Sequence, residues 1–280
     1  MSTTSAPPAP GRAGRNLPAA IAVGLALGAA ILGTLYSPYR WTFVLVLLAA
    51  SLVGTSEIVR ALRTLGAVPP ALPLYVGGTA MVVCAYRYGS TELFLALALT
   101  VLACVLWRIA DPAEGILRDL TAGVFTAAYV PFLIGFAALL TVPDDGAFRV
   151  TAFIATVVCS DVGGYAAGVL FGKHPMAPSV SPKKSWEGFA GSALACAAAG
   201  AVFFWTLFDA APLLGAVYGL AVVASATLGD LGESMVKRDI GIKDMGALLP
   251  GHGGLMDRLD SLLPTAPIAW LLLSAFVPVS

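Results

Sequence analysis

The sequence predicts an all-α polytopic membrane protein, and its composition and patterning both support that fold class. Of the 280 residues, 58% are hydrophobic and only 11% are charged, against roughly 25% charged in an average soluble domain. The apolar residues form continuous runs without alternation, which predicts helices and excludes the strands of a barrel. The 16 basic and 16 acidic residues cancel, so the basic excess of a nucleic-acid-binding protein is absent. We therefore exclude an ordinary soluble enzyme, a disordered chain and a nucleic-acid partner.

The apolar runs have the length of membrane spans, since about 20 residues cross roughly 30 Å of hydrocarbon. We predict about nine transmembrane helices, at 17–36, 41–59, 71–87, 92–110, 120–142, 150–172, 189–208, 212–229 and 262–279. Residues 1–16 are rich in Pro, Ala and Ser and predict a disordered tail. A cleaved signal peptide is the alternative for the first 36 residues, although the apolar run is long for one.

Lysine and arginine positions predict the orientation, because cytoplasmic loops carry the excess of both residues. With the N-terminus in the cytoplasm, 13 of the 16 fall on the inside and only Arg40, Arg87 and Arg149 on the outside. We therefore expect a multi-pass protein of the cell (plasma) membrane with its C-terminus outside. The N-terminal helices span 17–148, and a C-terminal region at 149–280 carries the cytoplasmic loops 173–188 and 230–261.

Two groups of glycines at helical spacing predict close packing between helices inside the bundle. Gly24 and Gly28 form a GxxxG pair, and Gly164, Gly168 and Gly172 form a three-member series. Such patterns are common in membrane helices, so we favour packing within one chain over a specific dimer contact.

Charge is concentrated in two of the predicted cytoplasmic loops. Residues 230–260 hold ten of the 32 charged residues, and residues 173–187 add a second polar segment. Solvated connectors are the simple interpretation. However, carboxylates alternate with cations among glycines, which suits a site for Mg²⁺ and phosphate together. The mixed pattern therefore favours a functional site on the cytoplasmic side.

Two acidic residues lie inside predicted spans. Asp161 is about 12 residues into the helix at 150–172, where an ionised carboxylate is costly unless it faces a polar cavity. We interpret Asp161 as functional. Glu57 lies near the cytoplasmic end of its span, so it either has a function or reaches to the membrane surface.

The segment from Ser234 to Asp260 has about a dozen polar and glycine positions at fixed spacing. These are Ser234, Lys237, Arg238, Lys243, Asp244, Pro250, Gly251, His252, Gly253, Gly254, Asp257, Arg258 and Asp260. The pattern resembles the signature of the phosphatidate cytidylyltransferases, or CDP-diacylglycerol synthases. Segments 160–165, 171–174 and 181–188 resemble the same family, with Ser185 where the family often has Thr. The resemblance covers about residues 150–270.

The resemblance implies a metal-dependent reaction at the cytoplasmic face, in which CTP and phosphatidate give CDP-diacylglycerol and pyrophosphate. The predicted layout suits this chemistry, because CTP is cytosolic and the phosphate of phosphatidate lies at the bilayer surface. The implied cofactor is Mg²⁺, with room for a second, monovalent cation such as K⁺. The same resemblance leaves room for a homodimer.

Residue roles follow from the same resemblance. It implies catalytic roles for Asp230, Asp257, Lys237, Arg238 and Asp260. Asp230 and Asp257 are the expected metal ligands, with Asp161 and Asp260 as the second choice. The expected substrate-binding residues are Asp161, Lys183, Lys184, Ser185, Ser234, His252 and Arg258.

Two other classes stay open as alternatives. A membrane CTP-dependent prenol kinase, or a cytidylyltransferase acting on an isoprenoid lipid, would share parts of this site. A proton- or cation-coupled transporter would use a buried carboxylate such as Asp161, but its usual internal repeat is not evident in the sequence.

Overall fold

The structure is a computed structural model that describes residues 17–110, 114–246, 248 and 253–278. The predicted disordered tail at 1–16 and the candidate residue His252 lie outside the described residues. The described part is mostly helical, as the composition predicts. Its helices are α1 (Leu17–Leu35), α2 (Trp41–Thr64), α3 (Ala71–Tyr88), α4 (Ser90–Ala110), α5 (Ile116–Ala127), the π-helical turn η1 (Ala128–Phe132), α6 (Leu133–Leu140), α7 (Gly146–Phe171), α8 (Trp186–Leu207), α9 (Pro212–Ile240), α10 (Met256–Leu259) and α11 (Leu262–Phe276).

Each of the nine predicted spans coincides with helical structure, but the count of nine membrane crossings is not confirmed. Within the described residues, seven helical segments are long and apolar enough to cross a membrane. Helix α3 is not among them, and the part of α1 whose side chains are described, Gly24–Leu35, is an apolar helix shorter than a span. The last turn of α3 reads Tyr86-Arg87-Tyr88, which lowers its apolar character. Leu95, Leu99, Leu102 and Leu106 form an exposed stripe along α4, as expected for a helix that faces lipid.

Pro131 accounts for the π-helical turn η1. Pro131 lies inside the rod formed by α5, η1 and α6. It has no backbone N–H to donate to the preceding turn, and its ring crowds that turn. The chain accommodates it with a single π-helical turn and continues as α6, so the rod from Ile116 to Leu140 stays long enough to cross a membrane.

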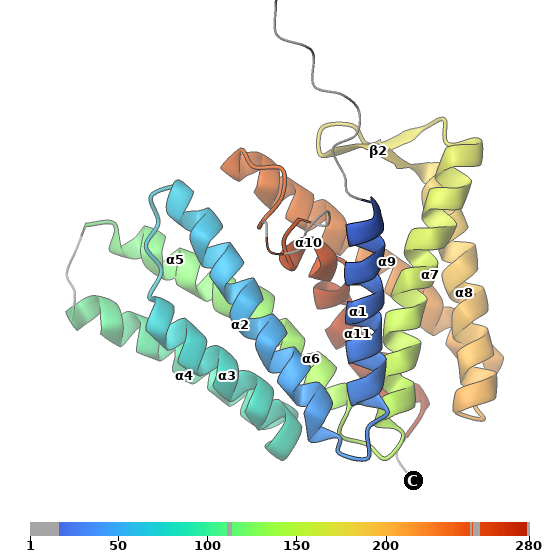
Figure 1. Ribbon diagram of the computed structural model, residues 1–280, viewed down its shortest axis with the longest axis horizontal. Coiled ribbons are helices and arrows are strands. Elements are labelled where there is room, and N and C mark those ends of the chain that lie inside the picture. Colours follow the sequence, from blue (N-terminus) through green and yellow to red (C-terminus); the bar gives the residue numbers. More distant parts are fainter. Residues whose placement is uncertain (1–16, 111–113, 247, 249–252, 279–280) are drawn as a thin grey trace, which may run out of the picture.

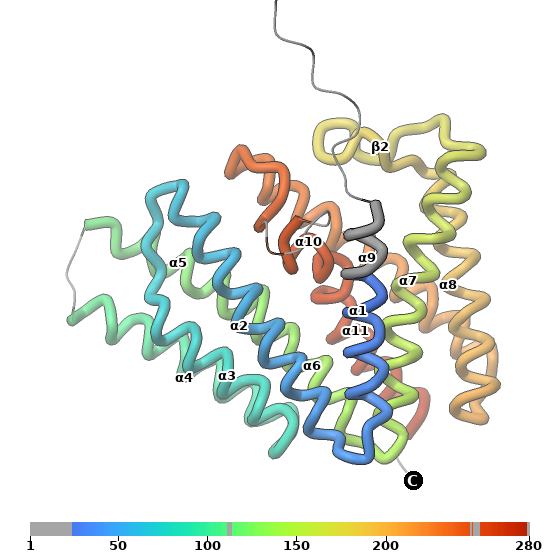
Figure 2. Tube along the Cα trace, in the orientation of Figure 1, coloured from blue at the N-terminus to red at the C-terminus, as the bar shows by residue number. Residues whose placement is uncertain are grey.

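The helices form two groups joined by α11 (Figure 1). Helices α2 to α6 pack together in one group, while α8 packs against both α7 and α9 in the other. Helix α11 contacts α6 on one side and α7 and α9 on the other. The chain trace in Figure 2 shows the short α10 close to the junction of the two groups. The C-terminal group carries most of the residues that the sequence marks as functional.

Two features of the predicted cytoplasmic loops differ from the prediction. The loop expected at 230–261 begins later, because α9 continues to Ile240 and ends at Gly241, which has a φ of 78°. Polar residues do not break a helix, whereas a glycine in the left-handed region ends one. The loop expected at 173–188 contains a two-stranded antiparallel sheet of β1 (Pro175–Ala177) and β2 (Ser181–Ser185). The all-α prediction therefore misses one small hairpin.

Glycines let α7, α8 and α9 approach closely. A side chain at Gly188 of α8 would lie 3.1 Å from the carbonyl oxygen of Gly164 on α7, and one at Gly219 of α9 would lie 2.0 Å from the carbonyl oxygen of Cys196. The predicted packing of the Gly164 series inside the bundle is thus confirmed. For Gly24 and Gly28 it is wrong, since among the described residues neither has a neighbouring atom within 4 Å of the position of a side-chain carbon.

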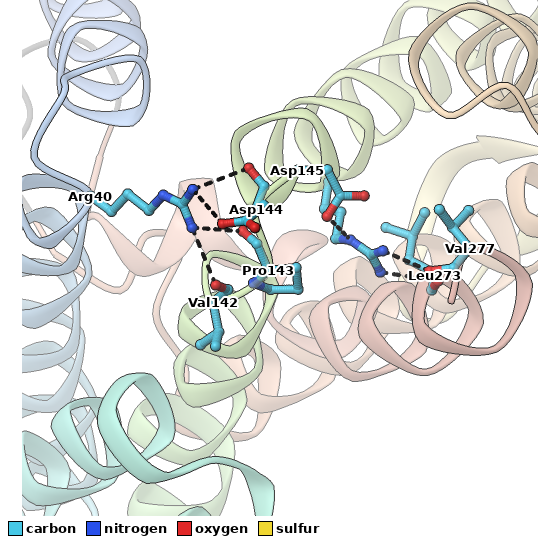
Figure 3. A network of polar contacts seen from close by, with 8 residues as sticks. Arg40, Val142, Pro143, Asp144, Asp145, Leu273 and Val277 are labelled. Atoms are coloured by element: carbon cyan, nitrogen blue, oxygen red, sulfur yellow. Dashed lines mark hydrogen bonds and ion pairs between the residues drawn. The ribbon is translucent and has the colours of Figure 1, made fainter. Parts of the chain in front are cut away.

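Arg149 and Arg40 tie helix ends together, and Figure 3 shows Arg40 beside its partners in the segment before α7. Arg149 lies in the first turn of α7 with 1% of its surface exposed. It donates to Asp145 at 2.7 Å and to the carbonyl oxygens of Leu273 and Val277 at 3.1 and 2.6 Å. It therefore joins α7 to α11, whereas the sequence places it simply among the outside charges. Arg40 makes similar bonds to the segment before α7.

Gly219→Val is expected to destabilise the bundle. Gly28→Val is the control, because the structure leaves space for a side chain at Gly28. Forcing a branched side chain against the α8 backbone costs at least about 1–3 kcal/mol. Thermal unfolding of the purified proteins in detergent should show a lower midpoint for Gly219→Val alone. Equal midpoints would contradict the packing of α8 against α9.

Candidate functional site

A cavity of about 360 Å³ opens where α7, α8 and α9 meet the β1–β2 hairpin. Glycines of α7 and α8 form part of its wall, so the absence of side chains there leaves the space open. The charged residues in its lining come from three elements. They are Asp161 on α7, Lys183 and Lys184 on β2, and Asp230 on α9. Ser160, Ser181, Ser185, Ser192 and Ser261 add hydroxyl groups.

Asp230 and Lys184 form an ion pair across the cavity. The Lys184 Nζ lies 2.5 Å from Oδ2 of Asp230, and the two side chains are 25% and 34% exposed. The pair joins the hairpin to α9, and its two residues are 46 positions apart in the chain. Because both groups stay accessible, each can also bind a charged ligand in the cavity.

Asp161 faces the same cavity from α7. Its surroundings include the negative charges of Asp230 and Asp260 and the positive charges of Lys184 and Arg258. An ionised carboxylate inside this span requires a polar cavity with partners, and the structure provides one. Its role in binding stays a prediction.

The hairpin is held at its base and at its turn. Ser185 caps α8 by accepting a hydrogen bond from the Gly188 N–H at 3.1 Å. Glu187 accepts bonds from the backbone N–H groups of Lys173 and His174 at 3.1 and 3.2 Å. At the turn, Nε of Arg238 donates to the carbonyl oxygen of Val180. These contacts fix the lysines of β2 over the cavity.

A second polar cluster lies beyond the cavity, between α9 and α10. Lys237 Nζ lies 3.1 Å from Oε2 of Glu233 and 2.9 Å from Oδ1 of Asp257. The three side chains are 17%, 0% and 6% exposed, in that order. Oδ2 of Asp257 accepts from the backbone N–H groups of Met245 and Gly254 at 2.9 and 2.8 Å. Asp257 therefore organises the loop that precedes it.

Other predicted site residues lie around these two clusters. Asp260 follows α10 and accepts from the Ser261 N–H at 2.7 Å. Arg258 is exposed on α10, and Ser234 is half-buried one turn after Asp230 on α9. The structure thus brings Asp161, Lys183, Lys184, Ser185 and Asp230 to one cavity, with Lys237 and Asp257 in the adjoining cluster.

Glu57 joins this second cluster from the N-terminal half of the chain. Its side chain on α2 is buried, so the alternative in which it reaches to the membrane surface is wrong. It accepts hydrogen bonds from the backbone N–H groups of Leu255 and Met256 at 3.0 and 2.8 Å. No local pattern identifies this contact, because its partners lie almost 200 residues away. The only sequence signal is a carboxylate inside an apolar span.

The donor set fits a Mg²⁺ ion that shares its coordination with a substrate. Within the described ranges, no three His, Cys, Asp or Glu side chains gather closely enough to hold a metal alone. Mg²⁺ commonly takes one or two carboxylates and completes its shell with water and substrate phosphates. Asp230 offers a carboxylate accessible from the cavity. Each expected ligand, Asp230 and Asp257, is paired here with a lysine ammonium, so both sites accept positive charge.

Comparison with known proteins gives consistent matches. The sequence matches the profile described as Cytidylyltransferase family over residues 18–276. It is 48% identical over 281 residues to a Mycobacterium leprae protein named phosphatidate cytidylyltransferase, covering 94% of this chain and 89% of that one. A protein of that name from Mycobacterium tuberculosis strain H37Rv is 46% identical over 278 residues, with coverages of 94% and 84%. Phosphatidate cytidylyltransferase 4, chloroplastic, of Arabidopsis thaliana is 29% identical, with coverages of 89% and 70%.

Lys237→Met is expected to lower stability, because it leaves two buried carboxylates without their shared cation. Removing one partner of a buried charge cluster costs about 3 kcal/mol or more. The midpoint of thermal unfolding in detergent measures the effect, with the exposed Lys243→Met as the control. A Lys237→Met protein as stable as the control would show that the cluster contributes nothing to the fold.

Proposed function

The chain belongs to the cytidylyltransferase family, and from that premise we propose that it is a phosphatidate cytidylyltransferase. It transfers the cytidylyl group of CTP to phosphatidate and releases CDP-diacylglycerol and pyrophosphate. The observation that carries this proposal is the cavity in which Lys183, Lys184, Asp161 and Asp230 meet, in a chain whose relatives carry that name.

The reaction joins two anions, so its main requirements are charge neutralisation and alignment. A phosphate oxygen of phosphatidate attacks the α-phosphorus of CTP, and the bond from that phosphorus to the bridging oxygen of the leaving pyrophosphate breaks. Phosphatidate is already ionised near neutral pH, so no side chain has to remove a proton from it. Positioning and preorganised charges supply most of the acceleration in such a step.

The residues of the hairpin are suited to hold phosphate. Lys183 and Lys184 lie on β2 above the cavity, and Ser185 follows them at the start of α8. We assign them to the phosphate groups of the lipid and of CTP. Asp161, Ser234, His252 and Arg258 complete the proposed substrate-binding set. Lys237 and Arg238 on α9 would neutralise phosphoryl charge, and Asp260, like Asp161, is the second choice for a metal ligand.

We assign Asp230 and Asp257 as the residues that would hold Mg²⁺. Asp257 lies outside the lining of the cavity and its Oδ1 is paired with Lys237, so metal binding there requires the ammonium group to move. When bound, the metal would neutralise phosphate charge and polarise the reacting phosphoryl group. A second, monovalent cation such as K⁺ and a homodimer stay predictions.

The proposed location is the cell (plasma) membrane, with the site facing the cytoplasm. The hairpin and the start of α1 lie at one end of the bundle, and the α1–α2 connection and the C-terminus lie at the other (Figure 1). This arrangement agrees with a cytoplasmic N-terminus and hairpin, and with a C-terminus on the outside. The proposed orientation gives cytosolic CTP direct access to the cavity.

The direct test is an assay of the purified protein in detergent with CTP and phosphatidate, with Mg²⁺ or with EDTA. We expect Mg²⁺-dependent release of pyrophosphate and a lipid product with the mass of CDP-diacylglycerol. A product only from free prenols, or from other phosphorylated lipids, would replace the substrate assignment. A folded protein that forms no product from CTP with any of these lipids would contradict the proposal.

Asp257→Asn is expected to abolish transfer while the protein stays folded and inserted. The change removes the negative charge that both Lys237 and the proposed metal require. Turnover is measured by the lipid-product assay and folding by thermal unfolding, with the exposed Asp239→Asn as the matched control. Turnover of Asp257→Asn close to that of the control would disprove the metal assignment.

Lys184→Ala is expected to reduce turnover by about 10-fold without abolishing it, because one of several charged phosphate contacts is lost. Lys173→Ala, whose side chain is exposed outside the cavity lining, serves as the control in the same assay. If both variants keep full turnover, the hairpin does not belong to the site.

A further inference from the structure

Glu57 is a charged group of the N-terminal helices that reaches the loop of the proposed site. It lies on α2 with 3% of its surface exposed. Its two carboxylate oxygens accept from two successive backbone N–H groups, Oε1 from Leu255 at 3.0 Å and Oε2 from Met256 at 2.8 Å. A bidentate contact of this kind fixes both the distance and the orientation of the segment that it holds.

The loop approaches this carboxylate as closely as its backbone allows. A side-chain carbon at Gly246 would lie 2.2 Å from Oε1 of Glu57, and one at Gly254 would lie 2.7 Å from Oε2. The same carbon at Gly254 would lie 2.6 Å from the backbone nitrogen of Gly246. The two ends of the loop therefore lie against each other and against Glu57, in a space that only glycine fits.

Packing one turn earlier on α2 strengthens the same contact. A side-chain carbon at Gly54 would lie 3.1 Å from the sulfur of Met256, so the Met256 side chain rests on the α2 backbone. Gly54 and Glu57 are three residues apart and share one face of the helix. Helix α2 thus holds Met256 by both its side chain and its backbone N–H.

Asp257 is the next residue in the chain and accepts hydrogen bonds from two further backbone N–H groups of the loop. It accepts from Met245 and Gly254, while Glu57 accepts from Leu255 and Met256. The two carboxylates therefore share four backbone donors of one short loop. Any displacement of Leu255 and Met256 moves Asp257 with them, because the residues are adjacent.

We infer that Glu57 is a positioning residue, whose carboxylate holds the 253–257 segment so that Asp257 keeps its place beside Lys237. This inference rests on the proposed function, in which Asp257 takes part in the reaction. Glu57 itself lies outside the lining of the cavity, so it acts through Asp257 and does not touch the substrates. The charge pattern of the loop does not reveal this role, since the residue belongs to the other half of the chain.

The test compares Glu57→Gln with the wild type and with Glu92→Gln, whose carboxylate lies on α4 away from this loop. Glutamine keeps the length but replaces one acceptor oxygen with an amino group that cannot accept from a backbone N–H. Loss of an outer partner of a metal ligand commonly costs about 10- to 100-fold in activity or metal affinity. We expect kcat to fall within that range, and the Mg²⁺ concentration for half-maximal activity to rise.

Hydrogen–deuterium exchange supplies a readout that does not depend on activity. In Glu57→Gln, peptides that contain residues 245–257 should exchange faster, while peptides from α7 and α8 should match the wild type. Gly246→Ala keeps the carboxylate but crowds it, and should show the same local change and a reduced kcat. If Glu57→Gln lowers the stability of the whole protein, Gly246→Ala still tests whether Glu57 positions the 253–257 segment.

Unchanged exchange in 245–257, or an unchanged kcat in both variants, would overturn the inference. Faster exchange throughout the bundle in both variants would also overturn it, since Glu57 would then serve the fold in general. A wild type without cytidylyltransferase activity would instead refute the proposed function. The exchange experiment would still report whether Glu57 positions the loop.

Discussion

Asp257 accepts three hydrogen bonds that join three separate parts of the chain. One comes from the Lys237 ammonium on α9. The other two come from the backbone N–H groups of Met245 and Gly254, in the loop between α9 and α10. A buried charge is costly unless it is paired and hydrogen-bonded, so these partners cannot separate without a large penalty. Met245 and Gly254, in the described part of the polar segment after α9, are therefore held in place by Asp257. The positions of α9, the loop and α10 depend on one another through this carboxylate.

The cavity depends on a different constraint, the close approach of α7, α8 and α9. Gly164 and Gly188 let two helix backbones come nearly into contact, and the space for a ligand lies where these helices carry no side chains. The hairpin covers this space with Lys183 and Lys184, and Asp230 on α9 forms an ion pair with Lys184. Packing by small residues and the charged lining of the cavity thus share one set of helices. In the proposed function, CTP and the phosphate of the lipid would meet in this cavity.

Much of this arrangement follows from the sequence, and the exceptions have physical causes. Hydropathy locates the helices, but it cannot separate a full span from α3, whose final turn is polar. The spacing within 234–260 predicts a site but not where α9 ends, since only Gly241 stops the helix. The hairpin is too short to show the alternation typical of strands. The contact of Glu57 with Met256 spans 199 positions, and no local pattern encodes it.

In the proposed function, CTP binds in the cavity between α7, α8, α9 and the hairpin. Photolabelling with an azido derivative of CTP, followed by mass spectrometry of the modified peptides, would locate its binding site. We predict labels within residues 160–188 and 226–261, and their loss when excess CTP competes. CTP-protected labels confined to the apolar groove between α3 and α4, which is lined by residues such as Val76 and Leu99, would contradict it.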